Sequence, residues 1–214
     1  MADLGCVDIE YFAGMYNRGD LVRQMCVAGK VAFKDCDVDP AEWPAKKADK
    51  AMYPNGGLPV ACIGGCRMVE TMAITRFLAI KCGWFPADAK CAWAADTCMD
   101  MWTDTMNAMG GFLFAPEDGK AAALEKLLGC VDSFLCVAAE RMAAMKWKFA
   151  AGNSCSVGDV AIFTLWANTA NNDMCPLKQQ MCDIYAKYPC LKTGLDCLLT
   201  KNEVHLKSRA CYPF

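Results

Sequence analysis

The sequence predicts an α/β domain followed by an all-α domain. Up to about residue 83, stretches with the spacing of strands alternate with stretches of helical spacing, whereas the chain after Trp84-Phe-Pro86 shows helical spacing throughout. Hydrophobic residues make up 55% of the 214 residues and charged residues 21%, which is typical of a folded chain. We therefore expect two domains, over residues 1–83 and 88–214.

The first domain begins with the pattern of a strand, a helix and a second strand. Residues Val7–Phe12 and Val31–Phe33 have the pattern of strands. Between them, Asp20 can cap a helix that ends at Gly29. The prolines and glycines between Trp43 and Gly57 then indicate a loop with at most a short helix.

A hairpin and a helix complete the first domain, which gives the order βαβ, linker, ββα. The runs Leu58–Ile63 and Cys66–Val69 flank Gly64-Gly65, and paired glycines supply the positive φ angles of a two-residue turn. Thr71 can cap the helix that follows, and Gly83 can end it.

Four major helices are expected in the second domain. Apolar spacing predicts the first two over residues 88–109 and 119–147. The third begins at a capping box formed by Ser156 and Asp159, to which we assign a structural role, and the leucines of 191–199 mark the last.

Charge and hydropathy exclude several classes of protein. A net charge of -2 argues against nucleic acid or an acidic membrane as the main partner. The chain has no run approaching the roughly 18 apolar residues of a membrane-spanning helix. Its first residues carry acids where a secretory signal has a basic start and an apolar run. We expect a cytoplasmic protein.

The sixteen cysteines are scattered singly, without any Cys-x-x-Cys pair, and His205 is the one histidine. This pattern predicts no metal site. We expect most of the cysteines to be reduced and buried as small hydrophobic residues, and His205 to lie on the surface.

Short motifs spread over nearly the whole chain form a recognisable set. They are Tyr11-Phe12, Trp43-Pro44 with Lys47, residues 57–60, residues 70–79, residues 152–154, Ser156 with Asp159, and residues 188–191. This set resembles the cytosolic glutathione transferases, in particular the sigma class and the related S-crystallins. The resemblance implies a thioredoxin-like first domain that binds glutathione as co-substrate, with no other cofactor, an all-helical second domain and a homodimer.

The resemblance also implies which residues bind the γ-glutamyl and cysteinyl units of glutathione. Pro59 matches the proline that is cis in the family, where the backbone of the residue at Leu58 pairs with the cysteinyl part of the peptide. Glu70 and Thr71 match the pair that holds the γ-glutamyl group, and a helix N-terminus can bind a carboxylate through its free N–H groups. Thr71 is otherwise only a helix cap.

Trp43 and Lys47 resemble the pair near the glycyl carboxylate, although a solvated lysine beside a packed tryptophan is the alternative. Asp96, Asp100 and Asp104 share one helix face. Asp104, with Asp100 as second choice, resembles the aspartate that reaches across the dimer to the neighbour's γ-glutamyl ammonium. A solvated acidic face is the alternative.

Tyr11 is the candidate catalytic residue. Because a thiol with a pKa near 8.5 is mostly protonated at pH 7, an enzyme that uses the thiolate must stabilise it. In the tyrosine-type transferases, a phenol at the end of the first strand donates to the sulfur, and Tyr11 matches that position. The alternative is an ordinary strand aromatic. The loop after Tyr11 differs from the family pattern, so Tyr16 either lies near the site or belongs to a loop that partly closes it.

These motifs lead to two hypotheses. The first is a glutathione transferase that conjugates small apolar electrophiles, with Met106, Met109, Phe112 and Trp166 as candidates for lining the pocket; a glutathione-dependent isomerase would use the same site. The second is a non-catalytic relative, either a crystallin-like structural protein or a subunit of a larger assembly. The altered loop and Gly57, which replaces the usual polar residue, favour the second.

Overall fold

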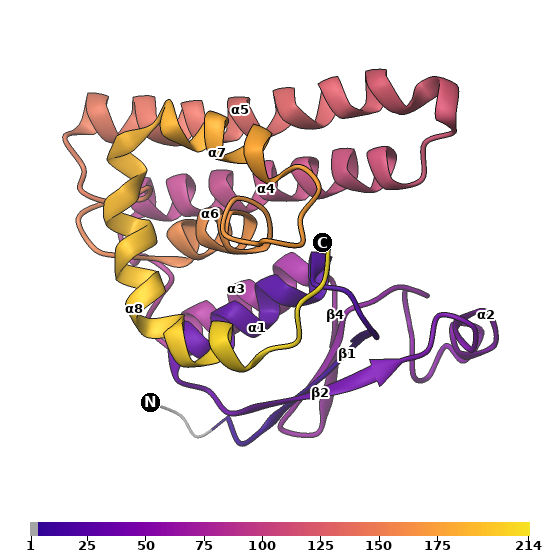
Figure 1. Ribbon diagram of the computed structural model, residues 1–214. Coiled ribbons are helices and arrows are strands. Elements are labelled where there is room, and N and C mark those ends of the chain that lie inside the picture. Colours follow the sequence, from indigo (N-terminus) through magenta and orange to yellow (C-terminus); the bar gives the residue numbers. More distant parts are fainter. Residues whose placement is uncertain (1–3) are drawn as a thin grey trace.

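In the computed structural model, which describes residues 4–214, a four-stranded sheet lies beside a larger group of helices (Figure 1). The strands are β1 (Val7–Phe12), β2 (Phe33–Val38), β3 (Val60–Ile63) and β4 (Cys66–Val69). The helices are α1 (Asn17–Gly29), α2 (Trp43–Lys46), α3 (Thr71–Lys81), α4 (Ala89–Leu113), α5 (Lys120–Met145), α6 (Val157–Asn168), α7 (Lys178–Ala186) and α8 (Lys192–Ser208). The expected fold class is confirmed.

The sheet has the strand order β2-β1-β3-β4. Strand β1 is parallel to β2 and antiparallel to β3, and β3 and β4 form the hairpin expected at Gly64-Gly65. Alternation along β1 buries Val7, Ile9 and Tyr11 on one face. Helices α1 and α3 lie between the sheet and the C-terminal helices (Figure 1), so these side chains belong to the interior.

The second half of the chain is built around α6. Helices α4 and α5 form a long pair, and α6 packs against α1, α4 and α8. Every residue of α6 except Trp166 is buried. A helix can be buried so completely only if the free N–H groups at its start have acceptors. The capping box at Ser156 and Asp159 supplies some of these, and the Trp84 carbonyl accepts from the Val157 N–H at 2.9 Å. Within residues 4–214, no helix is both long and apolar enough to cross a membrane.

Three predicted boundaries are wrong. Helix α1 begins at Asn17, and Asp20 is a buried residue of its first turn, not its cap. The second strand covers Phe33–Val38 in place of 31–33, because it is an edge strand with mostly exposed polar residues that pairs in register with β1. The cap position of α3 is occupied by Glu70, so Thr71 is its first residue.

Other corrections concern single side chains and one helix. Helix α7 was not predicted; it is nine residues long and buries only three of them, which leaves a weak apolar pattern. All sixteen cysteines are free thiols, but only Cys26, Cys98 and Cys175 are fully buried. His205 is half-buried, with its ring edge-on to that of Phe33 at 5.7 Å, and not a surface residue.

Candidate functional site

Three segments that were predicted to bind glutathione meet at one edge of the sheet. The register pairs Glu10 with Val60, and Val60 with Val69. Neighbouring strands lie about 5 Å apart, and both pairs are antiparallel, so the line continues through the residue after Glu10, the residue before Val60 and the residue after Val69. These residues are Tyr11, Pro59 and Glu70.

Tyr11 is buried against the first turn of α1. Its side chain is 5% exposed, and its hydroxyl accepts a hydrogen bond from the backbone N–H of Arg18 at 3.3 Å. The ring lies over Gly19: a Cβ atom on this glycine would come within 2.6 Å of Tyr11 Cγ. Burial raises the pKa of Tyr11, and the N–H and charge of Arg18 offset this only in part. The phenol therefore keeps its proton at neutral pH and can act as a donor.

The start of β3 and the start of α3 adjoin Tyr11. The peptide bond between Leu58 and Pro59 is cis, as the resemblance implied. Glu70 has φ 71°, a positive value that is uncommon outside glycine and typical of sites under functional constraint. Its carboxylate accepts a hydrogen bond from Asn55 Nδ2 at 3.0 Å. Thr71 is buried directly after it, where α3 begins.

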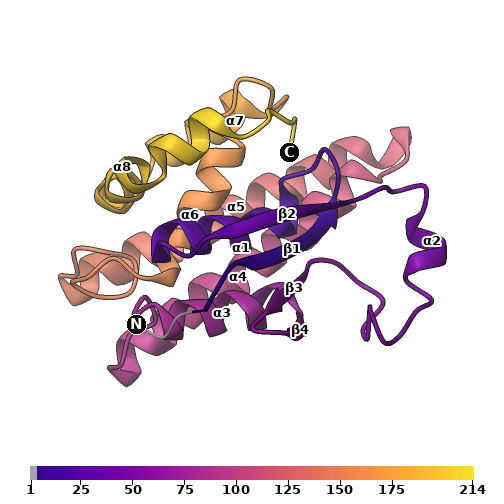
Figure 2. The same cartoon turned by 90° about the horizontal axis from the view of Figure 1, so that it is seen from below.

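Helix α2 lies to one side of the sheet, apart from the other helices (Figure 2). Trp43 is packed edge-on between Phe12 at 5.6 Å and Tyr53 at 5.0 Å between ring centroids. Tyr53 in turn donates to Glu10 Oε2 at 2.8 Å, and burial together with this bond raises the pKa of Tyr53 to about 12. Lys47, just after α2, is exposed. Trp43 is thus fixed to the sheet, whereas Lys47 is not held in this way.

An apolar cavity of about 20 Å³ lies between the two halves of the chain. Its wall includes residues of α1, α4, α6 and the segment after α8: Asn17, Trp102, Met106, Met109, Leu165 and Phe214. Of the predicted lining residues, Met106 and Met109 line this cavity. Phe112 is instead buried in the core, and Trp166 packs beside Phe163.

The cavity and the Tyr11 hydroxyl share the first turn of α1. Asn17 lines the cavity, and Arg18, the next residue, donates to Tyr11 through its backbone. The side chain of Arg18 also donates to Asn107 Oδ1 on α4 at 2.7 Å. Arg18 therefore joins the end of β1 to the helix that carries Met106 and Met109.

One of the three aspartates aligned on α4 forms an ion pair with a residue of α3. Asp96 forms an ion pair with Arg76 at 2.8 Å, which accounts for one of the three carboxylates. Asp100 and Asp104 are exposed one and two turns further along. Binding by Asp104 across a dimer remains a prediction.

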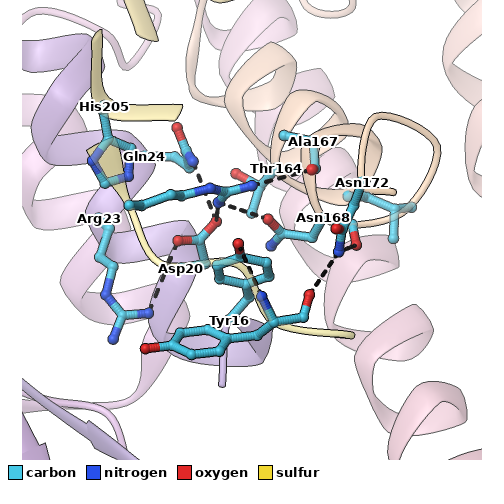
Figure 3. Close-up of polar contacts among 12 residues, drawn as sticks. Tyr16, Asp20, Arg23, Gln24, Thr164, Ala167, Asn168, Asn172 and His205 are labelled. Atoms are coloured by element: carbon cyan, nitrogen blue, oxygen red, sulfur yellow. Dashed lines mark hydrogen bonds and ion pairs between the residues drawn. The ribbon is translucent and has the colours of Figure 1, made fainter. Parts of the chain in front are cut away.

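A buried polar cluster joins α1, α6 and the segment after α8 beside this site (Figure 3). Its centre is Asp20, which is 0% exposed and accepts from Arg209 at 2.9 Å and from Gln24 at 3.2 Å. Arg23 lies 3.9 Å from the other Asp20 oxygen. Asp20 thus connects helix α1 to the segment that follows α8.

Sequence reasoning missed four residues of this region: Asn17, Arg18, Gly19 and Phe214. Arg18 and Gly19 stand in the loop after Tyr11 that differs from the family pattern, so an Arg-Gly pair seven residues beyond Tyr11 was an available signal. Phe214 gave no signal, because nothing in the sequence links it to α4 and α6.

Comparison with known proteins gives matches over part of the sequence and over the whole structure. No model of a known protein family matches the chain. Glutathione S-transferase 2 of Caenorhabditis elegans is 32% identical over 97 residues, which are 45% of this chain and 50% of that protein. The chain spans about half the length of the curated relatives it matches.

Solved structures match almost the complete chain. A monomeric glutathione S-transferase of the hookworm Necator americanus has a TM-score of 0.80 at 20% identity, covering 98% of this chain and all of that one (100%). The prostaglandin synthase D of Nilaparvata lugens has a TM-score of 0.78 at 21% identity, covering 96% and 99%. The protein therefore has the fold of glutathione transferases, and the sequence matches support a relationship with that family.

Proposed function

We propose that the chain is a tyrosine-type glutathione transferase, nearest in its motifs to the sigma class, that conjugates glutathione to small apolar electrophiles. One observation carries the proposal: the register of β1, β3 and β4 aligns Tyr11, Pro59 and Glu70 at one edge, and the turn that holds the Tyr11 hydroxyl also lines an apolar cavity. The thiol of glutathione and an apolar electrophile would therefore meet at the N-terminus of α1.

Glutathione would lie along the sheet edge, held mostly by backbone groups. The Leu58 backbone precedes β3 and would pair with the cysteinyl unit as a short added strand. The free N–H groups at the start of α3 would bind the γ-glutamyl carboxylate with the Thr71 hydroxyl, while Glu70 would meet the ammonium. Trp43 and Lys47 would face the glycyl carboxylate.

Tyr11 would act by donating a hydrogen bond to sulfur. Its raised pKa keeps the phenol neutral, and the Arg18 N–H occupies a lone pair of the oxygen, so the O–H remains available. The thiol proton would pass to water and leave a thiolate that Tyr11 stabilises. The sulfur would then attack the electrophilic carbon, and the leaving group would depart with its bonding pair.

We propose that the protein works in the cytoplasm as a homodimer, in which Asp104 of one copy would approach the γ-glutamyl ammonium bound to the other. Asp104 is exposed on α4, as this role requires.

A non-catalytic, crystallin-like role is the second candidate, and the closed site favours it. Tyr11 is 5% exposed, and the adjoining cavity has only about 20 Å³. A structural protein that kept the fold but not the substrate would tolerate both features.

The test is conjugation of glutathione to 1-chloro-2,4-dinitrobenzene by the wild type and the Tyr11→Phe variant. Loss of the phenolic donor should lower kcat/KM by roughly 100-fold, the usual effect of removing one donor to a developing anion. The thiol pKa in the complex, followed by thiolate absorbance, should rise. Tyr188→Phe, which removes a hydroxyl bound to Asp132, is the matched control and should keep full activity.

Immobilised glutathione separates the two candidates. The transferase should be retained and eluted by free glutathione. Folded protein that is not retained and shows no conjugation would favour the structural role, and a rate unchanged by Tyr11→Phe would remove Tyr11 from the mechanism.

A further inference from the structure

The segment after α8, residues 209–214, returns to the junction of α1 and α6 (Figure 1). Arg209 fixes its beginning, because its guanidinium donates to Asp20 and to Asn168 Oδ1, both at 2.9 Å, and to the Ala167 carbonyl at 3.1 Å. The same guanidinium lies 4.0 Å from the centre of the Tyr16 ring. Figure 3 shows these partners converging from α1 and α6.

Tyr16 holds the remainder of the segment by three hydrogen bonds. Its hydroxyl donates to the Ala210 carbonyl at 2.7 Å and accepts from the Tyr212 N–H at 3.3 Å. Its own backbone N–H donates to the Phe214 carbonyl at 2.8 Å. Asn172 adds a bond from Nδ2 to the Tyr212 carbonyl at 2.8 Å. Polar contacts from both halves of the chain thus fix the position of Phe214.

Phe214 forms part of the wall of the apolar cavity between α4 and α6, which also includes Met106 and Met109. The space left is about 20 Å³. A single water needs about 10–15 Å³, whereas a cavity that binds benzene has about 150 Å³. An aromatic electrophile therefore does not fit while Phe214 is in place.

We propose that Phe214 is the specificity-determining residue of the apolar subsite. Its side chain takes the place of the electrophile's ring, and residues 210–214 move aside when an aromatic substrate binds, with Arg209 remaining as the anchor. The inference rests on the proposed function, because it takes this cavity as the place where the electrophile binds. It adds that the size of the accepted substrate is set by the segment after α8.

The division between anchor and moving part follows from burial. The Arg209 and Asp20 side chains are 11% and 1% exposed, and breaking so buried an ion pair is strongly unfavourable. Residues 210, 211 and 213 are exposed, and apart from the Asn172 bond the segment is held by Tyr16. Loss of the Tyr16 hydroxyl should therefore loosen residues 210–214 without releasing Arg209.

The test uses 8-anilinonaphthalene-1-sulfonate as an aromatic probe of the cavity in the absence of glutathione. Phe214→Ala should raise the affinity for this dye by about tenfold or more, since each methylene in an apolar pocket already changes affinity about tenfold. Pro213→Ala, at the exposed neighbouring residue, is the matched control and should bind the dye like the wild type. Tyr16→Phe keeps the Phe214 ring and the bond from its own backbone N–H to Phe214, but it removes the two hydrogen bonds that the Tyr16 hydroxyl forms with Ala210 and Tyr212, so it should raise the affinity to a smaller extent.

Conjugation assays on the same proteins test the link to specificity. Phe214→Ala should raise kcat/KM for a bulky aryl halide relative to 1-chloro-2,4-dinitrobenzene, and Pro213→Ala should leave this ratio unchanged. Equal dye affinity in Phe214→Ala and Pro213→Ala would overturn the inference while the proposed function stood. Stronger dye binding in a Phe214→Ala protein that, like the wild type, never conjugates glutathione would show that Phe214 fills the cavity, but it would reject the proposed function and with it the role of Phe214 in substrate specificity.

Discussion

Gly19 is a residue at which the requirements of a helix and of the site conflict. It lies inside α1, where alanine would favour the helix by about 1 kcal/mol. Yet the ring of Tyr11 occupies the space of a Cβ atom, which would come within 2.6 Å of Tyr11 Cγ. The position of the phenol therefore depends on residue 19, in the first turn of α1, having no side chain.

Replacing Gly19 by alanine should displace the Tyr11 ring. Because a misplacement of about 1 Å at a reacting group costs roughly 100-fold in rate, we expect a loss of that order in kcat/KM for glutathione conjugation. Gly129→Ala on α5, where a Cβ would meet nothing within 4 Å, should stabilise the protein slightly and leave the rate unchanged. Equal rates for the two variants would show that this packing does not position the phenol.

At the level of the element, α6 is stabilised by a single carboxylate. Asp159 accepts hydrogen bonds from the Ser156 N–H at 2.9 Å, the Ser156 hydroxyl at 3.2 Å and the Ala150 N–H at 3.0 Å. It is 4% exposed, and burial raises its pKa to about 6, although the three donors act in the opposite direction. At neutral pH, these donors are the partners that allow the charge to stay buried.

Asp159→Ala should therefore lower the stability of the folded protein. Two buried N–H groups and a hydroxyl would lose their acceptor, so we expect a loss of about 2–4 kcal/mol in the free energy of unfolding, measured in urea. Glu140→Ala, at an exposed residue of α5, should change it by less than about 0.5 kcal/mol. A small effect of Asp159→Ala would mean that α6 is held by packing alone.

At the scale of the whole molecule, contacts between the last helix and the sheet domain join the two halves. Arg209 and Asp20 are 189 residues apart in sequence, and His205 of α8 packs against Phe33 of β2. Burial lowers the pKa of His205, and Asp20 opposes this only in part. The folded protein therefore favours the neutral imidazole.

The protein should accordingly lose stability in mild acid through His205. The unfolded chain takes up its proton near pH 6.5 and the folded chain only at a lower pH, so the free energy of unfolding should fall as the pH drops from about 6.5 to the folded pKa. His205→Gln should lack this part of the pH dependence, because all other groups are common to both proteins. Since His205 is the one histidine, its proton NMR titration is unambiguous, and a folded pKa above 6.5 would contradict the prediction.

Features with local causes were predicted well. The turn at Gly64-Gly65 needs positive φ, the capping box at Ser156 and Asp159 spans four residues, and α4 and α5 repeat apolar residues over many turns. The strand at 33–38 was misplaced because its exposed, charged residues become a strand only through pairing with β1. Helix α7 was missed for a similar reason, since it is short and packs against α5.

By itself the sequence determined the fold class and the order of the elements other than α7, because turns, caps and periodic apolar faces act between near neighbours in the chain. Only the tertiary structure decided that Gly19 lies under the phenol, that Asp20 is paired with Arg209, and that Phe214 forms a wall of the apolar cavity. These contacts bring together residues from separate elements, two of the pairs nearly a whole chain length apart. Their positions follow from how the two halves pack, and no local pattern encodes that packing.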